Sequence, residues 1–157
     1  KIVPIFVCPS ALDGNVPGQS NFAHNAGAAD TQFATSSNTT ALRGAFHPSQ
    51  KTSVATMARD GLMNTIFYSE QRADGNVAAT NIEGGAFHAG STPNQQTTAG
   101  TAIDTTSEHH AHSNHPGGVN AAFGDAHVGF YSNDVSTTHW QGLSTANGGE
   151  NEFAGSE

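Results

Sequence analysis

The chain has 157 residues and a mass of 16.1 kDa, which suits a single domain, residues 1–157, with one modest hydrophobic core. Only 35% of the residues are hydrophobic and 11% are charged, so the composition argues against long packed helices and for a β-rich fold with many loops. The formal net charge of −8 would repel phosphate backbones and anionic lipid surfaces, so nucleic-acid binding is disfavoured.

The N-terminal third is predicted to contain one strand followed by a long irregular stretch. Residues 2–8 form an apolar run that ends at Pro9-Ser10, which is typical of a strand. This run contains Cys8, the only cysteine, so an intrachain disulfide and a thiolate cluster are excluded, and Cys8 is either a small buried hydrophobe or a free thiol. Residues 11–45 are rich in Asn, Gly, Ser, Thr and Ala, which predicts a long excursion with little regular structure.

The middle of the chain contains the best candidate for a central strand. Residues 53–60 fit either a short helix or a strand and end in a turn at Asp60-Gly61. Residues 64–69 are dense in β-branched and aromatic side chains and are predicted to form the strand. Residues 72–114 are a second loop-like insertion rich in Gly, Thr, Asn and Gln.

The C-terminal third predicts a hairpin and a short helix. Apolar residues recur at every second position over 119–123 and 128–131, and Gly124-Asp125-Ala126-His127 supplies the turn. The apolar positions of the second strand are Val128 and Phe130. Residues 138–143 are predicted to be a short helical turn or a 3₁₀ segment that carries Trp140, the sole tryptophan, and residues 147–157 form an acidic, glycine-rich tail.

Five short motifs occur in a fixed order along the chain. They are Ile5–Ser10 with Cys8 and Pro9, Asn21–Gly27, Arg59–Ile66 through Glu70, His115–Asn120 with Asp125, and Asn147–Glu150. Together they resemble the C-terminal globular part of the planctomycete-type prepilin-like family, which is similar to major pseudopilins of type II secretion and is labelled by an H-x9-DG motif. Two positions depart from that pattern. Ala126 replaces the glycine after Asp125, so a left-handed glycine turn is not expected there, and Leu62-Met63 replace two hydroxyl residues.

The resemblance implies an α+β, mostly β fold: a small antiparallel sheet with long Gly/Asn/Thr-rich loops. It implies a structural subunit, extracellular, periplasmic or at the cell surface, in a filament, secretion apparatus or surface assembly. Its partners would be further copies or other pilin-like subunits. The family's long N-terminal pilin helix, its only route to a membrane, is absent from residues 1–157, and we expect it to have been removed by processing or truncation.

Most of the motif residues need no catalytic role. Asp60, Asn64 and Asp125 are each placed to form hydrogen bonds within their own turns, as Asp and Asn commonly do. His115 is expected to bond a strand carbonyl or the Asp125 carboxylate. The residues assigned to structural motifs are Cys8, Pro9, Asp60, Gly61, Asn64, Glu70, His115, Gly117, Gly118, Asn120, Asp125, Trp140, Gly149 and Glu150.

The density of histidines suggests an alternative function. The chain has nine histidines, and a candidate site for zinc, copper or nickel consists of His109, His110, His112, His115 and His127 with Asp125. The hairpin is expected to bring His127 within reach of His115. This site would make the chain a metal-binding protein or a metal-dependent hydrolase, although no Gly-x-Ser-x-Gly element or other catalytic motif is present, and no catalytic residue is assigned.

A calcium site is a second metal hypothesis, and it follows from the resemblance alone. Secretion pseudopilins often hold calcium in a C-terminal loop, and oxygen ligands are available here at Asp134, Ser136, Asn147, Glu150 and Glu152.

Overall fold

A computed structural model describes residues 4–10, 20–28, 43–46, 53–57, 59–71, 86–89, 92–94 and 110–148. The elements in chain order are η1 (Pro4–Phe6), β1 (Phe22–Gly27), α1 (Val54–Met57), η3 (Leu62–Asn64), β2 (Ile66–Glu70), β3 (Ala86–His88), β4 (Gly118–Phe123), β5 (Val128–Ser132) and α2 (Thr137–Ser144). Within the described residues, no helix is both long and apolar enough to cross a membrane.

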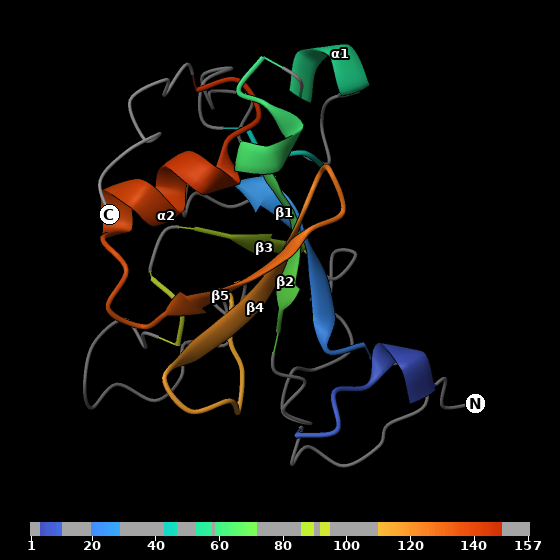
Figure 1. Cartoon of the computed structure of the whole chain (residues 1–157), viewed down its shortest axis with the longest axis vertical. Coiled ribbons are helices and arrows are strands. Elements are labelled where there is room, and N and C mark those ends of the chain that lie inside the picture. The colour runs from blue at the N-terminus through green and yellow to red at the C-terminus, as the bar shows by residue number, and fades with distance from the viewer. Residues whose placement is uncertain are drawn as a thin grey trace.

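One twisted sheet contains all five strands, in the order β3-β1-β2-β4-β5 (Figure 1). The pairs β1–β2, β2–β4 and β4–β5 are antiparallel, whereas β3 runs parallel to β1 at one edge. Helix α2 packs on one face of this sheet through Trp140 and Leu143. The prediction of a mostly β fold built on a small antiparallel sheet is therefore confirmed.

The core lies between α2 and the sheet. Val119, Ala121 and Phe123 of β4 point into it and are at most 3% exposed, as the alternation of that segment predicted. The rest of the cluster is formed by Ala23, Ile66, Phe87, Ala89, Ala111, Trp140 and Leu143.

A fully buried asparagine ties α2 to the strands. The side-chain amide of Asn25 donates hydrogen bonds to the carbonyls of Ile66, at 2.7 Å, and Ser144, at 2.9 Å, and its oxygen accepts one from the backbone N–H of Gly27. A buried amide is tolerated because its polar atoms have partners.

The predicted hairpin is present, but its second strand turns the other set of alternating side chains toward the core. The turn has three residues, Gly124 to Ala126, closed by hydrogen bonds from the Phe123 N–H to the His127 carbonyl and from the Ala126 N–H to the Phe123 carbonyl. Ala126 has a φ of 74°, so alanine adopts the left-handed conformation that we had not expected without glycine. Because this turn sets the register of β5, Tyr131 packs toward the core while Val128 and Phe130 are exposed.

Three further differences from the sequence predictions lie before β4. Within the predicted strand 2–8, residues 4–6 form the 3₁₀ helix η1 and Ile5 is 79% exposed, because this segment lies outside the sheet and does not bury its apolar side chains. Strand β1 lies within residues 11–45, where no strand was predicted. The hydrophobic pattern did not reveal it, because its inward side chains are the small Ala23 and the polar Asn25. Strand β3 lies within the predicted insertion 72–114.

Three element predictions agree with the structure. Residues 66–70 form the central strand β2, α1 supplies the helical alternative for residues 53–60, and the predicted C-terminal helical turn is the eight-residue helix α2. Ser136 caps α2, because its side chain accepts a hydrogen bond from the His139 N–H.

Candidate functional site

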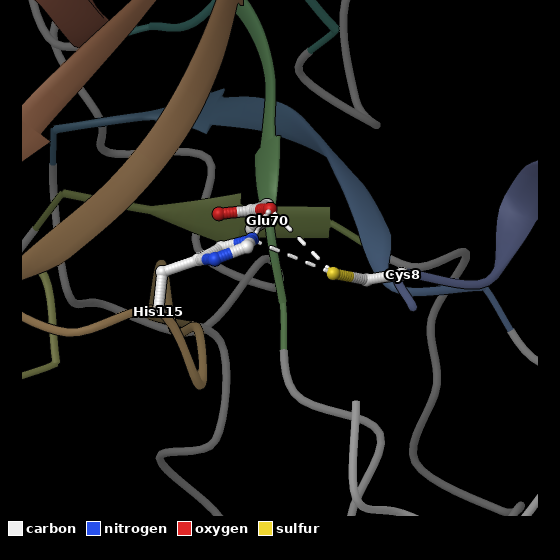
Figure 2. Close-up of side chains that lie close together, drawn as sticks. All are labelled: Cys8, Glu70 and His115. Carbon is white, nitrogen blue, oxygen red and sulfur yellow. Dashed lines mark hydrogen bonds and ion pairs between the residues drawn. The ribbon is translucent and has the colours of Figure 1, made fainter. Parts of the chain in front are cut away.

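A thiol, an imidazole and a carboxylate converge at one end of the sheet, on Cys8, His115 and Glu70 (Figure 2). The His115 Nε2 atom lies 3.1 Å from the Glu70 Oε1 atom and 3.5 Å from the Cys8 Sγ atom. The third distance, from Cys8 Sγ to Glu70 Oε1, is 3.9 Å. Three side chains of different chemistry therefore present one atom each to a common point.

Glu70 is the buried member of this cluster. Its side chain is 6% exposed, and its carboxylate accepts hydrogen bonds from the backbone N–H of Asn120, at 2.8 Å, and from the Asn120 side-chain amide, at 3.2 Å. The His115 side chain is 30% exposed, so the cluster opens to solvent on the histidine side. Burial of a carboxylate is costly unless hydrogen-bonding or positive partners surround it. Asn120 and His115 are the partners of the Glu70 carboxylate here.

The sheet register brings these three residues together. Glu70 ends β2, and because β4 runs antiparallel to β2, the segment before β4 that carries His115 begins at the same end of the sheet. Glu70 is also the register partner of Phe22 at the start of β1. The N-terminal segment docks beside that start, since the Asn21 N–H donates to the Phe6 carbonyl and the Cys8 N–H donates to the Asn21 side chain at 2.8 Å.

The geometry of the cluster differs from that of a nucleophilic triad. In a triad the nucleophile contacts one ring nitrogen of the histidine and the acid contacts the other. Here the Cys8 thiol and the Glu70 carboxylate both face Nε2. The cluster is thus arranged as three atoms around one point, which is the arrangement of metal ligands.

The predicted histidine set is not assembled in the described part of the chain. His115 and His127 lie at opposite ends of β4, because Gly118 pairs with Ser132 and Ala122 pairs with Val128, so the expectation that the hairpin joins them is wrong. His110 and His112 precede His115. Among the described residues, neither of them belongs with His115 to a group whose ligand atoms lie close enough together to bind one metal ion. His109 lies outside the described residues.

His127 instead pairs with Asp125 inside the hairpin turn. The Asp125 carboxylate accepts a hydrogen bond from the His127 backbone N–H at 3.1 Å and lies 2.6 Å from the ring Nδ1. These bonds lower the pKa of the Asp125 carboxyl, the backbone N–H contributing most. The His115 ring was expected to bond a strand carbonyl or the Asp125 carboxylate, but it contacts the Glu70 carboxylate and the Cys8 thiol instead. Asp125 bonds within its own turn, as expected.

The Asp60 motif lies away from the cysteine cluster. The Asp60 side chain accepts a hydrogen bond at 2.6 Å from the backbone N–H of Gly148, and the Asn64 side chain donates to the Asp60 carbonyl. Gly61 has a φ of 87°, which favours glycine. Asp60 therefore connects this turn to the start of the C-terminal tail.

The remaining motif residues have structural surroundings or are not described. Gly117 has a φ of 85°, and a side chain at Gly118 would collide with the backbone oxygen of Tyr131. Pro9 is exposed and Trp140 is buried. Gly149 and Glu150 lie outside the described residues, as does Glu152 of the calcium hypothesis.

Comparison with known proteins places the chain in a family. Residues 1–138 match the model of a family described as "Protein of unknown function (DUF1559)". The chain belongs to the DUF1559 family. This family is of the planctomycete prepilin-like type that the motif order predicted. No curated protein and no solved structure matches the DUF1559 chain.

In this DUF1559 domain each residue of the cluster comes from a different one of the five motifs. Cys8, Glu70 and His115 were all assigned to structural motifs from the sequence, but Cys8 and Glu70 were not grouped with the metal-ligand candidates. No spacing signal could have linked them, because Cys8 lies 62 residues from Glu70 and 107 residues from His115. The one sequence signal for this cluster was that three of the motifs contain a residue type able to bind a metal: a cysteine, a glutamate and a histidine.

Proposed function

We propose that this DUF1559 chain is the globular part of a pseudopilin-like structural subunit, extracellular, periplasmic or at the cell surface, that assembles with further copies of itself or with other pilin-like subunits. One observation carries the proposal. The sheet face opposite α2 bears large apolar side chains that are 40–65% exposed, namely Phe22, Tyr68, Val128 and Phe130.

These side chains share a face because of the strand register. Tyr68 pairs with Ala122, which pairs with Val128, and cross-strand partners in antiparallel sheets point to the same side. Phe130 follows on that side two residues after Val128. Single exposed apolar residues scattered over a surface are normal. A group of them on one face of a sheet, extending over several strands, is typical of an interaction surface.

The charge of the chain favours assembly through apolar contacts. With 13 acidic and 5 basic side chains, two copies repel one another at long range. Burial of the Val128 and Phe130 side chains would offset this repulsion. Self-association should therefore strengthen as salt screens the repulsion, whereas an interface held by ion pairs would weaken.

Sedimentation velocity over a range of protein and salt concentrations tests the proposal. We expect a mass above one chain that increases with ionic strength, and loss of this association in Phe130→Asp. Val54→Asp is the matched control, because Val54 is 63% exposed on α1, outside the sheet. A chain that stays monomeric throughout, or an equal effect of both substitutions, would rule out self-association through this face.

The other function that the sequence suggested, a histidine-based metal-dependent hydrolase, has less support. It would need several histidines in one group, and the described residues hold no such group.

A further inference from the structure

We propose that Cys8, Glu70 and His115 bind one divalent transition-metal ion of the zinc class. The proposal is independent of subunit assembly, and it places the metal on a mixed sulfur, oxygen and nitrogen set instead of on the histidine-rich segment. Its first support is geometric: Cys8 Sγ, Glu70 Oε1 and His115 Nε2 all lie within 4.8 Å of one another.

The distances fit one face of a tetrahedral zinc site. Zinc–sulfur bonds of about 2.3 Å and zinc–nitrogen or zinc–oxygen bonds of about 2.0–2.1 Å put tetrahedral ligand atoms about 3.5 Å apart for S to N or O and about 3.3 Å apart for N to O. The observed separations are 3.5 Å for Sγ to Nε2, 3.1 Å for Nε2 to Oε1 and 3.9 Å for Sγ to Oε1. Small side-chain adjustments therefore suffice to accommodate the ion.

The charges and surroundings also suit a dication. A Cys8 thiolate and the Glu70 carboxylate would neutralise two positive charges, with His115 as a neutral ligand, and binding would release the thiol proton to solvent. Asn120 holds the Glu70 carboxylate through two hydrogen bonds, which orients it as an outer-shell residue orients a metal ligand. Calcium and magnesium prefer all-oxygen sites, so the thiol and imidazole select zinc-class ions.

The ion would connect three separate parts of the fold. Cys8 belongs to the N-terminal segment outside the sheet, Glu70 to the central strand β2, and His115 to the turn before β4, as Figure 2 shows. Metal binding would therefore fasten the N-terminal segment to the sheet. Because the His115 side chain is 30% exposed, solvent would supply water as the fourth ligand.

Cobalt is the most direct probe, because it replaces zinc and gives a sulfur-to-cobalt charge-transfer absorption only when a thiolate coordinates it. We expect one cobalt per chain with this absorption, and displacement of the cobalt by zinc. Cys8→Ser should abolish the absorption, since Cys8 is the only cysteine. Glu70→Gln and His115→Ala should weaken binding strongly, and Asn120→Ala by about 10–100-fold.

Two measurements separate loss of the site from loss of the fold. His127→Ala is the matched control, because it removes a histidine bonded to a carboxylate at the far end of β4 and should leave metal affinity unchanged. Zinc should also protect Cys8 from alkylation in the folded wild-type chain but not in His115→Ala, with folding checked by circular dichroism. Absence of the charge-transfer absorption in the wild type, or metal binding that persists in Cys8→Ser and falls in His127→Ala, would overturn the proposal.

Discussion

The Asp60 carboxylate accepts a hydrogen bond at 2.6 Å from the backbone N–H of Gly148, which lies 88 residues further along the chain. This bond joins the turn before β2 to the segment that follows α2. Both residues are partly buried, so water cannot fully replace the carboxylate if it is removed.

Asp60→Ala should lower the free energy of unfolding by roughly 1–3 kcal/mol, because the Gly148 N–H loses a charged acceptor. Asp60→Asn should lower the free energy of unfolding by less, since an amide oxygen can still accept the hydrogen bond. Urea unfolding followed by Trp140 fluorescence measures both. Asp134→Ala, at an exposed position, should stay within about 0.5 kcal/mol of the wild type, and an equally small effect at Asp60 would contradict the role of this bond.

Ala126→Gly should stabilise the protein by about 0.5–1 kcal/mol. A left-handed conformation costs an L-residue about 1–2 kcal/mol, and the extra entropy of glycine in the unfolded chain cancels part of the gain. Ala122→Gly within β4 is the control and should destabilise by about 0.5–1 kcal/mol, because no left-handed strain is relieved there. Thermal unfolding of both variants gives the comparison, and destabilisation at both positions would argue against a left-handed Ala126.

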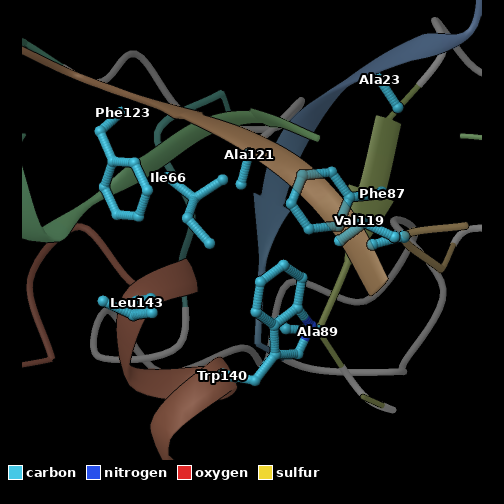
Figure 3. Close-up of a cluster of buried hydrophobic side chains, with 10 residues drawn as sticks. Ala23, Ile66, Phe87, Ala89, Val119, Ala121, Phe123, Trp140 and Leu143 are labelled. Carbon is cyan, nitrogen blue, oxygen red and sulfur yellow. The ribbon is translucent and has the colours of Figure 1, made fainter. Parts of the chain in front are cut away.

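Trp140→Ala should lower the free energy of unfolding by about 3–5 kcal/mol, the range for loss of a large buried aromatic side chain. The indole is fully buried and lies beside Phe87, with ring centroids 6.2 Å apart (Figure 3). The ring of Tyr131 also contacts it, with a centroid distance of 5.6 Å. Because this substitution removes the fluorescent probe, unfolding is followed by circular dichroism. A loss below about 1 kcal/mol would mean that α2 does not close the core as described.

The Asp125 carboxyl should titrate below its ordinary pKa of 3.8, because the His127 backbone N–H and then the His127 ring stabilise the carboxylate. A lowered pKa in the folded protein means that this contribution to stability is present above pH 3.8 and is lost as the pH falls through the lowered value.

A carboxyl NMR titration measures this pKa directly. His127→Ala should raise the Asp125 pKa only part of the way to 3.8, since the backbone N–H of residue 127 remains. His139→Ala, on α2, should leave it unchanged. A wild-type value at or above 3.8 would show that the turn does not form these bonds.

The hairpin and the C-terminal helix were predictable because their signals are local. Val119, Ala121 and Phe123 alternate with other residues, the turn between the strands is a short break of small residues around Asp125, and Trp140 lies in a segment with a helical pattern. The face that β5 buries was not predictable in this way. The three-residue turn with left-handed Ala126 sets the register of β5, so Tyr131 is turned inward although Val128 and Phe130 are also apolar.

Strand β1 was missed because its inward positions carry no hydrophobic signal. Ala23 is small, and Asn25 is polar yet fully buried, since its amide bonds the carbonyls of Ile66 and Ser144. These partners come from β2 and α2, so whether Asn25 can be buried depends on contacts that the local sequence does not contain. The apolar N-terminal run gave the opposite error: it was predicted to be a strand, but its described residues, 4–8, do not pair with the sheet.

By itself the sequence determined the family, the mostly β class of the fold and the hairpin, because ordered motifs and period-2 patterns are properties of nearby residues. Only the tertiary structure decided which motif residues meet. The antiparallel register of β1, β2 and β4 places Glu70 beside the segments that carry Cys8 and His115, and it separates His115 from His127 by the length of β4. Sequence separation contains no information about such pairings, because they depend on how the strands align across the whole sheet.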